Sequence, residues 1–176
     1  MNTQEFTKLA LRTESTSVCE VNPRIEHAIY GLNTEATEAL VWTDLTNLKE
    51  EIGDCLWYMA ILCDELGIEM SDTEVPHRGV QLEEQLKLVV AIAGDSLDHL
   101  KKVKFYGKAL DTDLLTSNME FMQCKLKRVC KSIGTTVEQE MERVIRKLQI
   151  RYPNKFTKED ALNRNLEAEL EVLKGL

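Results

Sequence analysis

The sequence predicts an all-α protein whose core is a four-helix bundle, and its composition and apolar spacing carry this prediction. Only 8 of the 176 residues are Gly and 3 are Pro, about half the combined share of roughly 12% in average proteins. A fold of many short strands needs more turn-forming residues, so an all-β fold is nearly excluded. Apolar residues instead recur at spacings of three and four, which indicates amphipathic helices.

The first pair of core helices is predicted from cap and stop residues. Pro23 begins a helix whose apolar stripe continues to about Trp42. Asn47, followed three residues later by Glu50, resembles a capping box at the start of the next helix, and Gly67 ends it. These two helices form a predicted hairpin.

A second pair follows a polar segment, residues 69–79, that is predicted to be a linker. One helix begins at Leu82 and ends in the basic segment 101–108, and the next runs from Leu114 to Ile133 before Gly134. A short N-terminal helix from Asn2 or Thr3 and two C-terminal helices complete the pattern. We predict seven helices and no strand, at about residues 3–12, 23–42, 47–66, 82–106, 114–133, 136–148 and 159–173.

The two hairpins are predicted to be an internal duplication, which would make one chain a pseudo-dimer. The first hairpin spans residues 20–72 and the second spans residues 80–150. Glu35 to Glu38 aligns with Ile92 to Asp95, and Cys63 aligns with Cys130. The two hairpins together supply the four helices of the bundle, with the other helices at its periphery.

The net charge, the length of the apolar runs and the cysteine pattern indicate which partners and which cell compartment to expect. The net charge is −8, from 22 Lys and Arg against 30 Asp and Glu, which argues against binding a nucleic-acid polymer. The longest apolar run, Cys55–Cys63, is shorter than the roughly 20 residues of a membrane span. None of the five cysteines forms a CxxC pair, so reduced, packed thiols are expected. We therefore expect a cytoplasmic protein with no membrane partner.

Four carboxylates form the candidate functional site. Glu35 and Glu38 are three residues apart on one predicted helix, and Glu51 and Asp54 are three apart on the next. Twelve residues lie between Glu38 and Glu51, so the hairpin places the two pairs at matching heights. Carboxylates gathered beside an apolar surface repel one another, and a cation that prefers oxygen ligands relieves this cost. Mg²⁺ is the expected cofactor, and Mn²⁺ can substitute.

The pattern resembles the MazG-like, all-α nucleoside triphosphate pyrophosphohydrolase superfamily, which includes MazG, dimeric-class dUTPases and dCTP pyrophosphatases. Its motif is ExxE, a spacer, then ExxD, which here is Glu35 to Glu38 followed by Glu51 to Asp54. Residues 101–108, 147–157 and 161–169 also resemble small MazG-like proteins. Because the resemblance covers nearly the whole chain, we treat residues 1–176 as one MazG-like domain.

The resemblance implies Mg²⁺-dependent cleavage of a (deoxy)nucleoside triphosphate to a monophosphate and pyrophosphate. The four carboxylates would hold the metal, and Glu38 is the candidate base that orients the attacking water. Seven residues are candidates for substrate binding, with cations for the phosphates and aromatic rings for the base: Lys101, Lys102, Lys104, Lys147, Arg151, Trp57 and Tyr58. The cations can equally be ordinary surface residues, and an aromatic residue at helical spacing is more often part of the core.

Departures from the family pattern keep an alternative open. Val144 stands where the family pattern has an Asn, which puts part of the phosphate site in doubt. In the second hairpin, two of the four ligand positions cannot bind a hard cation; the four are Ile92, Asp95, Asn118 and Phe121. The alternative is a catalytically inactive helical interaction or scaffold protein that retains the fold. The base, the sugar and any further homodimer are left open by the sequence.

Overall fold

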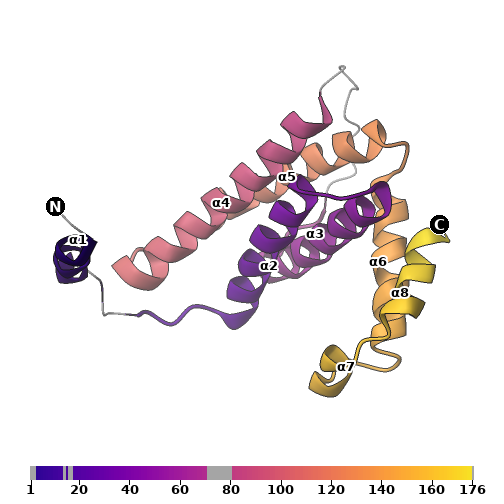
Figure 1. Cartoon of the computed structure of the whole chain (residues 1–176). Coiled ribbons are helices and arrows are strands. Elements are labelled where there is room, and N and C mark those ends of the chain that lie inside the picture. The colour runs from indigo at the N-terminus through magenta and orange to yellow at the C-terminus, as the bar shows by residue number, and fades with distance from the viewer. Residues whose placement is uncertain (1–2, 14, 16–17, 71–80, 176) are drawn as a thin grey trace.

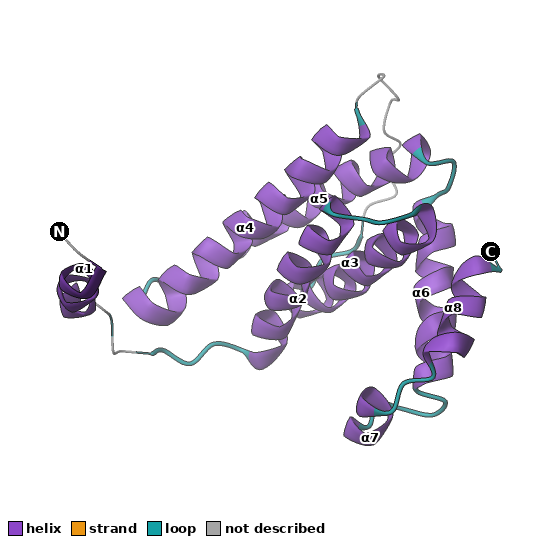
Figure 2. Cartoon of the chain, in the orientation of Figure 1, coloured by secondary structure: helices purple, strands orange, loops and turns teal. Residues whose placement is uncertain are grey.

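The computed structural model describes residues 3–13, 15, 18–70 and 81–175. Within these residues the chain forms helices and no strand, which confirms the all-α prediction (Figure 2). The elements are α1 (Thr3–Ala10), the 3₁₀ turn η1 (Leu11–Thr13), α2 (Pro23–Leu40), α3 (Leu45–Leu66), α4 (Leu82–Tyr106), α5 (Thr112–Ser132), α6 (Val137–Arg151), α7 (Lys158–Leu162) and α8 (Leu166–Lys174). None of the helices in the described part of the chain is long and apolar enough to cross a membrane.

Two helical hairpins form a four-helix bundle. The helices α2 and α3 pack against each other, as do α4 and α5, and the hairpins meet through α2 on α4 and α3 on α5 (Figure 1). Burying the apolar stripes of all four helices in one core is what stabilises the arrangement. The core includes Ile29, Leu32, Leu48, Ile52, Cys55, Met59, Leu62, Leu86, Val89, Leu100, Leu115, Met122 and Leu126.

Both hairpins end in the same local structure. Gly67 after α3 and Gly134 after α5 have φ of 68° and 75°, a left-handed conformation that favours glycine. The next residue closes each end with a backbone hydrogen bond of 3.0 Å, from Ile68 N to Cys63 O and from Thr135 N to Cys130 O.

The C-terminal helices pack on one side of this bundle. The helix α6 lies against α3, and α8 lies against α6 and α3, whereas α1 is set apart from the bundle (Figure 1). The close packing of α6 on α3 occurs at Gly53, where a Cβ atom would lie 3.0 Å from Val144 Cβ and 3.2 Å from Glu140 O. Gly53 therefore allows α6 to approach the helix that carries two of the candidate ligands.

The predicted start of α3 and the predicted single C-terminal helix are wrong. The helix α3 begins one turn early because Asp44, with extended backbone, caps it by accepting bonds from Thr46 N at 2.8 Å and Asn47 N at 3.0 Å. The single helix predicted for 159–173 is two helices, since Asn165 caps a new helix at Leu166. The candidate N-cap Asn2 and most of the predicted linker, residues 71–80, lie outside the described residues.

Candidate metal centre

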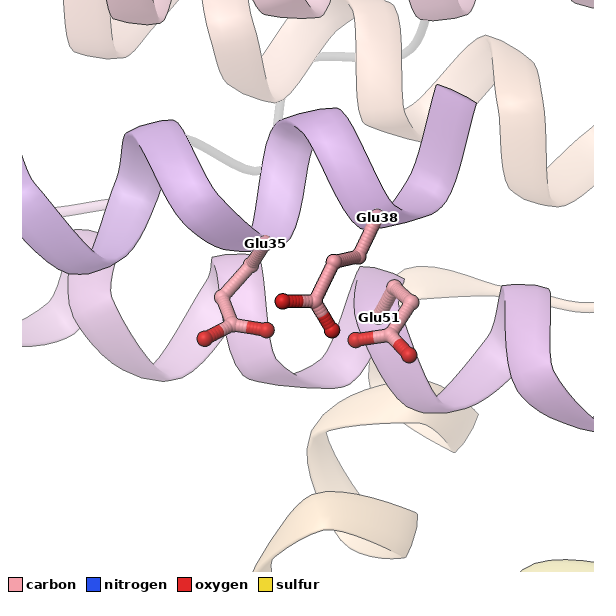
Figure 3. A group of neighbouring side chains, drawn as sticks. All are labelled: Glu35, Glu38 and Glu51. Carbon is pink, nitrogen blue, oxygen red and sulfur yellow. The ribbon is translucent and has the colours of Figure 1, made fainter. Parts of the chain in front are cut away.

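Three of the four predicted ligands meet between α2 and α3. Glu35 and Glu38 project from α2 and Glu51 projects from α3, and one carboxylate oxygen of each lies within 4.8 Å of the others (Figure 3). Among the residues that the structure describes, no other group of acidic, His or Cys side chains has this arrangement. The three carboxylates are hard oxygen donors of the kind that Mg²⁺ and Mn²⁺ prefer.

Burial and mutual repulsion disfavour the charged form of the carboxylates in this cluster. Glu51 is 5% exposed, Glu35 is half-buried and Glu38 is exposed. Burial, a hydrogen bond with Glu35 and repulsion from Glu50 and Glu35 raise the pKa of Glu51 to about 8. Burial and the nearby charges of Asp54 and Glu38 also raise the pKa of Glu35. A cation at this place would remove the repulsion, so the residues fit a metal ion.

Asn47 orients Glu51 and does not cap α3, contrary to the prediction. Its side-chain amide donates to Glu51 Oε1 at 2.6 Å, and its side-chain oxygen accepts from Thr43 N at 3.1 Å. Asn47 therefore links the α2–α3 turn to the buried carboxylate. Asn47 lies four residues before Glu51, a spacing that places both on one face of the helix.

Asp54, the fourth predicted ligand, is paired with a lysine instead. Lys147 Nζ of α6 lies 2.7 and 2.5 Å from the two Asp54 carboxylate oxygens and 3.1 Å from Glu50 Oε1. The lysine side chain is 1% exposed. Burial raises the pKa of Asp54 even though Lys147 opposes the shift. Lys147 thus places a positive charge beside Asp54, and the helix that carries Lys147 packs closely on α3 at Gly53.

A cavity of about 320 Å³ joins the carboxylates to the C-terminal helices. Arg151 of α6 and Arg164 of the α7–α8 connection line it together with the acidic residues. The sequence predicts Arg151 as a phosphate ligand, but it gives no such prediction for Arg164. Its only signal in the sequence is that it lies in a segment that resembles MazG-like proteins. Val144 is buried against Gly53, so it brings no polar group to this cavity.

The predicted base-stacking residues lie beside the carboxylates. Trp57 and Tyr58 line the same cavity, and they border a second, more apolar cavity of about 550 Å³ with His27 and Tyr152. The rings of Trp57 and Tyr58 meet edge to face, with centroids 4.9 Å apart. Gly31 leaves room for the Tyr58 ring, because a Cβ atom there would lie 2.2 Å from it.

The structure does not bring Lys101, Lys102 and Lys104, the predicted phosphate ligands of segment 101–108, to this cavity. Lys101 and Lys102 pair with Asp98, and Lys104 Nζ lies 2.6 Å from Glu26 Oε1. Glu26 precedes Glu35 by nine residues on α2, which is about 13 Å along a helix. Phosphate binding by these lysines stays a prediction from the sequence.

The second hairpin replaces the carboxylate cluster with a hydrogen bond. Asn118 Nδ2 lies 3.0 Å from Asp95 Oδ2 and 3.1 Å from Ser96 Oγ, and Phe121 is exposed. The Asn118 amide is thus a neutral hydrogen-bond partner for Asp95. That this half holds no metal stays a prediction from the sequence.

The sequence matches no protein-family model, and no curated protein or solved structure is significantly similar to it. The resemblance to MazG-like proteins therefore rests on the residue pattern of the chain itself.

Metal binding is expected to release protons at neutral pH. With a pKa of about 8, Glu51 is mostly protonated at pH 7, and a bound cation displaces that proton. We expect apparent Mg²⁺ affinity to rise with pH between 6 and 8. Calorimetry in two buffers of different ionisation enthalpy measures the protons released. Binding that is equally tight at pH 6 and pH 8, with no proton release, would contradict the cluster as the site.

Proposed function

We propose that this protein is a Mg²⁺-dependent nucleotide pyrophosphohydrolase that cleaves a (deoxy)nucleoside triphosphate to a monophosphate and pyrophosphate. The observation that supports the proposal most is the convergence of Glu35, Glu38 and Glu51 within 4.8 Å in a cavity that also contains Arg151. Carboxylates for a metal and a guanidinium for phosphate are the two kinds of group that phosphoryl chemistry needs in one place.

In this proposal, different residues of the cavity bind the metal, accept a proton and contact the substrate. Glu35, Glu38 and Glu51 would hold Mg²⁺, which when bound neutralises phosphate charge and lowers the pKa of a coordinated water. Glu38 is the exposed member of the cluster, so it can accept the proton of a water that attacks phosphorus. Arg151 can bind phosphate oxygens, and Trp57 and Tyr58 can contact the base.

Lys147 leaves Asp54 in a different role from the one predicted. Because both Asp54 oxygens bond Lys147 Nζ, Asp54 acts in this structure as the partner that keeps the lysine between α3 and α6. Direct ligation by Asp54 stays a prediction. Lys147 itself is too deeply buried to be a first contact for the substrate, so its proposed role is to neutralise Asp54 and Glu50 beside the metal centre.

The inactive scaffold remains the second candidate, and two observations favour it. Lys147 brings one positive charge to Asp54 and Glu50, so less negative charge is left for a metal to neutralise. Val144, where the family pattern has an Asn, is buried and apolar. An assay of pyrophosphate release from a panel of canonical and modified nucleotides, with Mg²⁺ or with a chelator, separates the two. If the protein is an enzyme, at least one nucleotide releases pyrophosphate in the presence of Mg²⁺. If it is an inactive scaffold, no nucleotide does.

A further inference from the structure

Two arginines of the cavity share one buried glutamate. Glu169 of α8 accepts bonds from Arg151 Nε and Nη2 at 3.1 and 2.6 Å, and from Arg164 Nε and Nη2 at 3.4 and 2.6 Å. Glu169 is 2% exposed, and both arginines line the cavity that holds the carboxylates. The three side chains bring together α6, α8 and the segment that joins α7 to α8.

Glu169 is ionised at neutral pH, so both arginines pair with a carboxylate. Burial alone would raise the pKa of Glu169, but the hydrogen bonds and charges of Arg151 and Arg164 outweigh burial and hold it at about 2. Glu169 uses two nitrogens of each guanidinium. Since a guanidinium has five N–H donors, each arginine keeps donors for another acceptor. The group of three carries a net charge of +1.

The helix α8 is held firmly enough to position this group. At its C-terminal end, Arg143 Nη1 of α6 donates to Leu173 O, and Arg143 Nε lies 2.8 Å from Glu140 Oε2. Arg143, Glu140 and Leu173 are all buried. With Glu169 bonded to Arg151 near the other end, α8 is tied to α6 at two places, so Glu169 has a defined place relative to the cavity.

We propose that Arg151 and Arg164, held as a pair by Glu169, bind the two terminal phosphates of the substrate. This inference rests on the proposed function and adds Arg164 as a substrate ligand and Glu169 as a positioning residue. Planar guanidiniums match phosphate oxygens with two parallel hydrogen bonds, which a lysine cannot do. A pyrophosphate group bridging the arginine pair and a metal at the carboxylates fits the mixed charges that line one cavity.

Calorimetric titration of inorganic pyrophosphate with Mg²⁺ into the full chain tests the pair without catalysis. Arg164→Gln is expected to weaken pyrophosphate binding tenfold or more, the range for a lost hydrogen bond to a charged group. Arg146→Gln is the matched control, because Arg146 is an exposed arginine of α6 that pairs with Glu142. Wild-type protein that does not bind pyrophosphate, or equal binding by the Arg164→Gln variant, would overturn the proposal.

Glu169→Gln distinguishes positioning from simple charge neutralisation. If Glu169 only offset charge, its removal would add a positive charge and tighten pyrophosphate binding. If it positions the arginines, the Gln variant binds pyrophosphate more weakly, with a higher KM for the triphosphate and kcat within about twofold. Glu169→Asp, which keeps the charge, is expected to recover part of the binding. Tighter or unchanged binding by the Gln variant would refute the positioning role, and if that variant does not fold, Arg164→Gln decides.

The proposal and the proposed function can fail separately. Pyrophosphate that binds through Arg164, in a protein that hydrolyses no nucleotide, would reject the enzyme and keep the phosphate-binding pair. Nucleotide hydrolysis that is unaffected by Arg164→Gln would keep the enzyme and reject the pair.

Discussion

Glu38→Gln is expected to lower Mg²⁺-dependent pyrophosphate release by ~100-fold or more, the typical contribution of a general base. Glu38 is both a candidate ligand and the exposed carboxylate that can accept a proton from water. Gln keeps the size of the side chain but can neither accept this proton nor bring a negative charge to the metal. Because Glu38 is exposed, the substitution should leave the melting temperature nearly unchanged.

Glu120→Gln is the matched control for this loss. Glu120 is an exposed glutamate of α5, so the substitution changes the net charge equally without touching the cluster. Initial rates of pyrophosphate release from both variants, at saturating Mg²⁺, give the comparison. A Glu38→Gln enzyme as active as the Glu120→Gln enzyme would remove Glu38 from the mechanism.

Lys147→Met should destabilise the metal-free protein by about 3 kcal/mol, the lower end of the range for breaking a buried ion pair. Lys147 Nζ is the cation bonded to both oxygens of Asp54 and to Glu50. Without it, the part-buried carboxylates of Asp54 and Glu50 lose the cation that bonds both of them. The loss should grow as the pH rises and Asp54 ionises, because the folded pKa of Asp54 is already raised and the lysine opposes that shift.

Urea unfolding of Lys147→Met, Asp54→Asn and the double variant measures this coupling. The double variant should be more stable than Lys147→Met alone, since removing the carboxylate removes the need for the lysine. A loss below about 0.5 kcal/mol in Lys147→Met, the size of an ordinary surface substitution, would show that the contact contributes little.

Spacing within a hairpin is what made the carboxylate cluster predictable. Glu35 and Glu38 share a helix face, and the length of the turn fixes their height relative to Glu51. The same reasoning predicts that Asp54 belongs to the cluster, because spacing within the hairpin carries no information about where α6 packs. Where α6 lies depends on Gly53 and Val144 packing against each other, and that tertiary contact delivers Lys147 to Asp54.

The start of α3 and the place of Arg164 could not be predicted from the sequence, for related reasons. Asp44 and Asn47 are both good N-caps, and local preference does not rank them. In the structure Asp44 is the cap, and Asn47 instead bonds Glu51 four residues later on α3. Arg164 is distant in sequence from the carboxylates and lies between two short helices, so its place depends on how α8 docks through Glu169. Periodicity contains no information about such docking.

The central claim is tested most directly by ³¹P NMR of a mixture of canonical dNTPs and NTPs incubated with the full chain and Mg²⁺. The proposed pyrophosphohydrolase predicts resonances of a nucleoside monophosphate and of pyrophosphate growing in equal amounts, and no reaction when a chelator replaces Mg²⁺. A mixture that stays unchanged with active metal present, or that yields orthophosphate and a diphosphate instead, would contradict it.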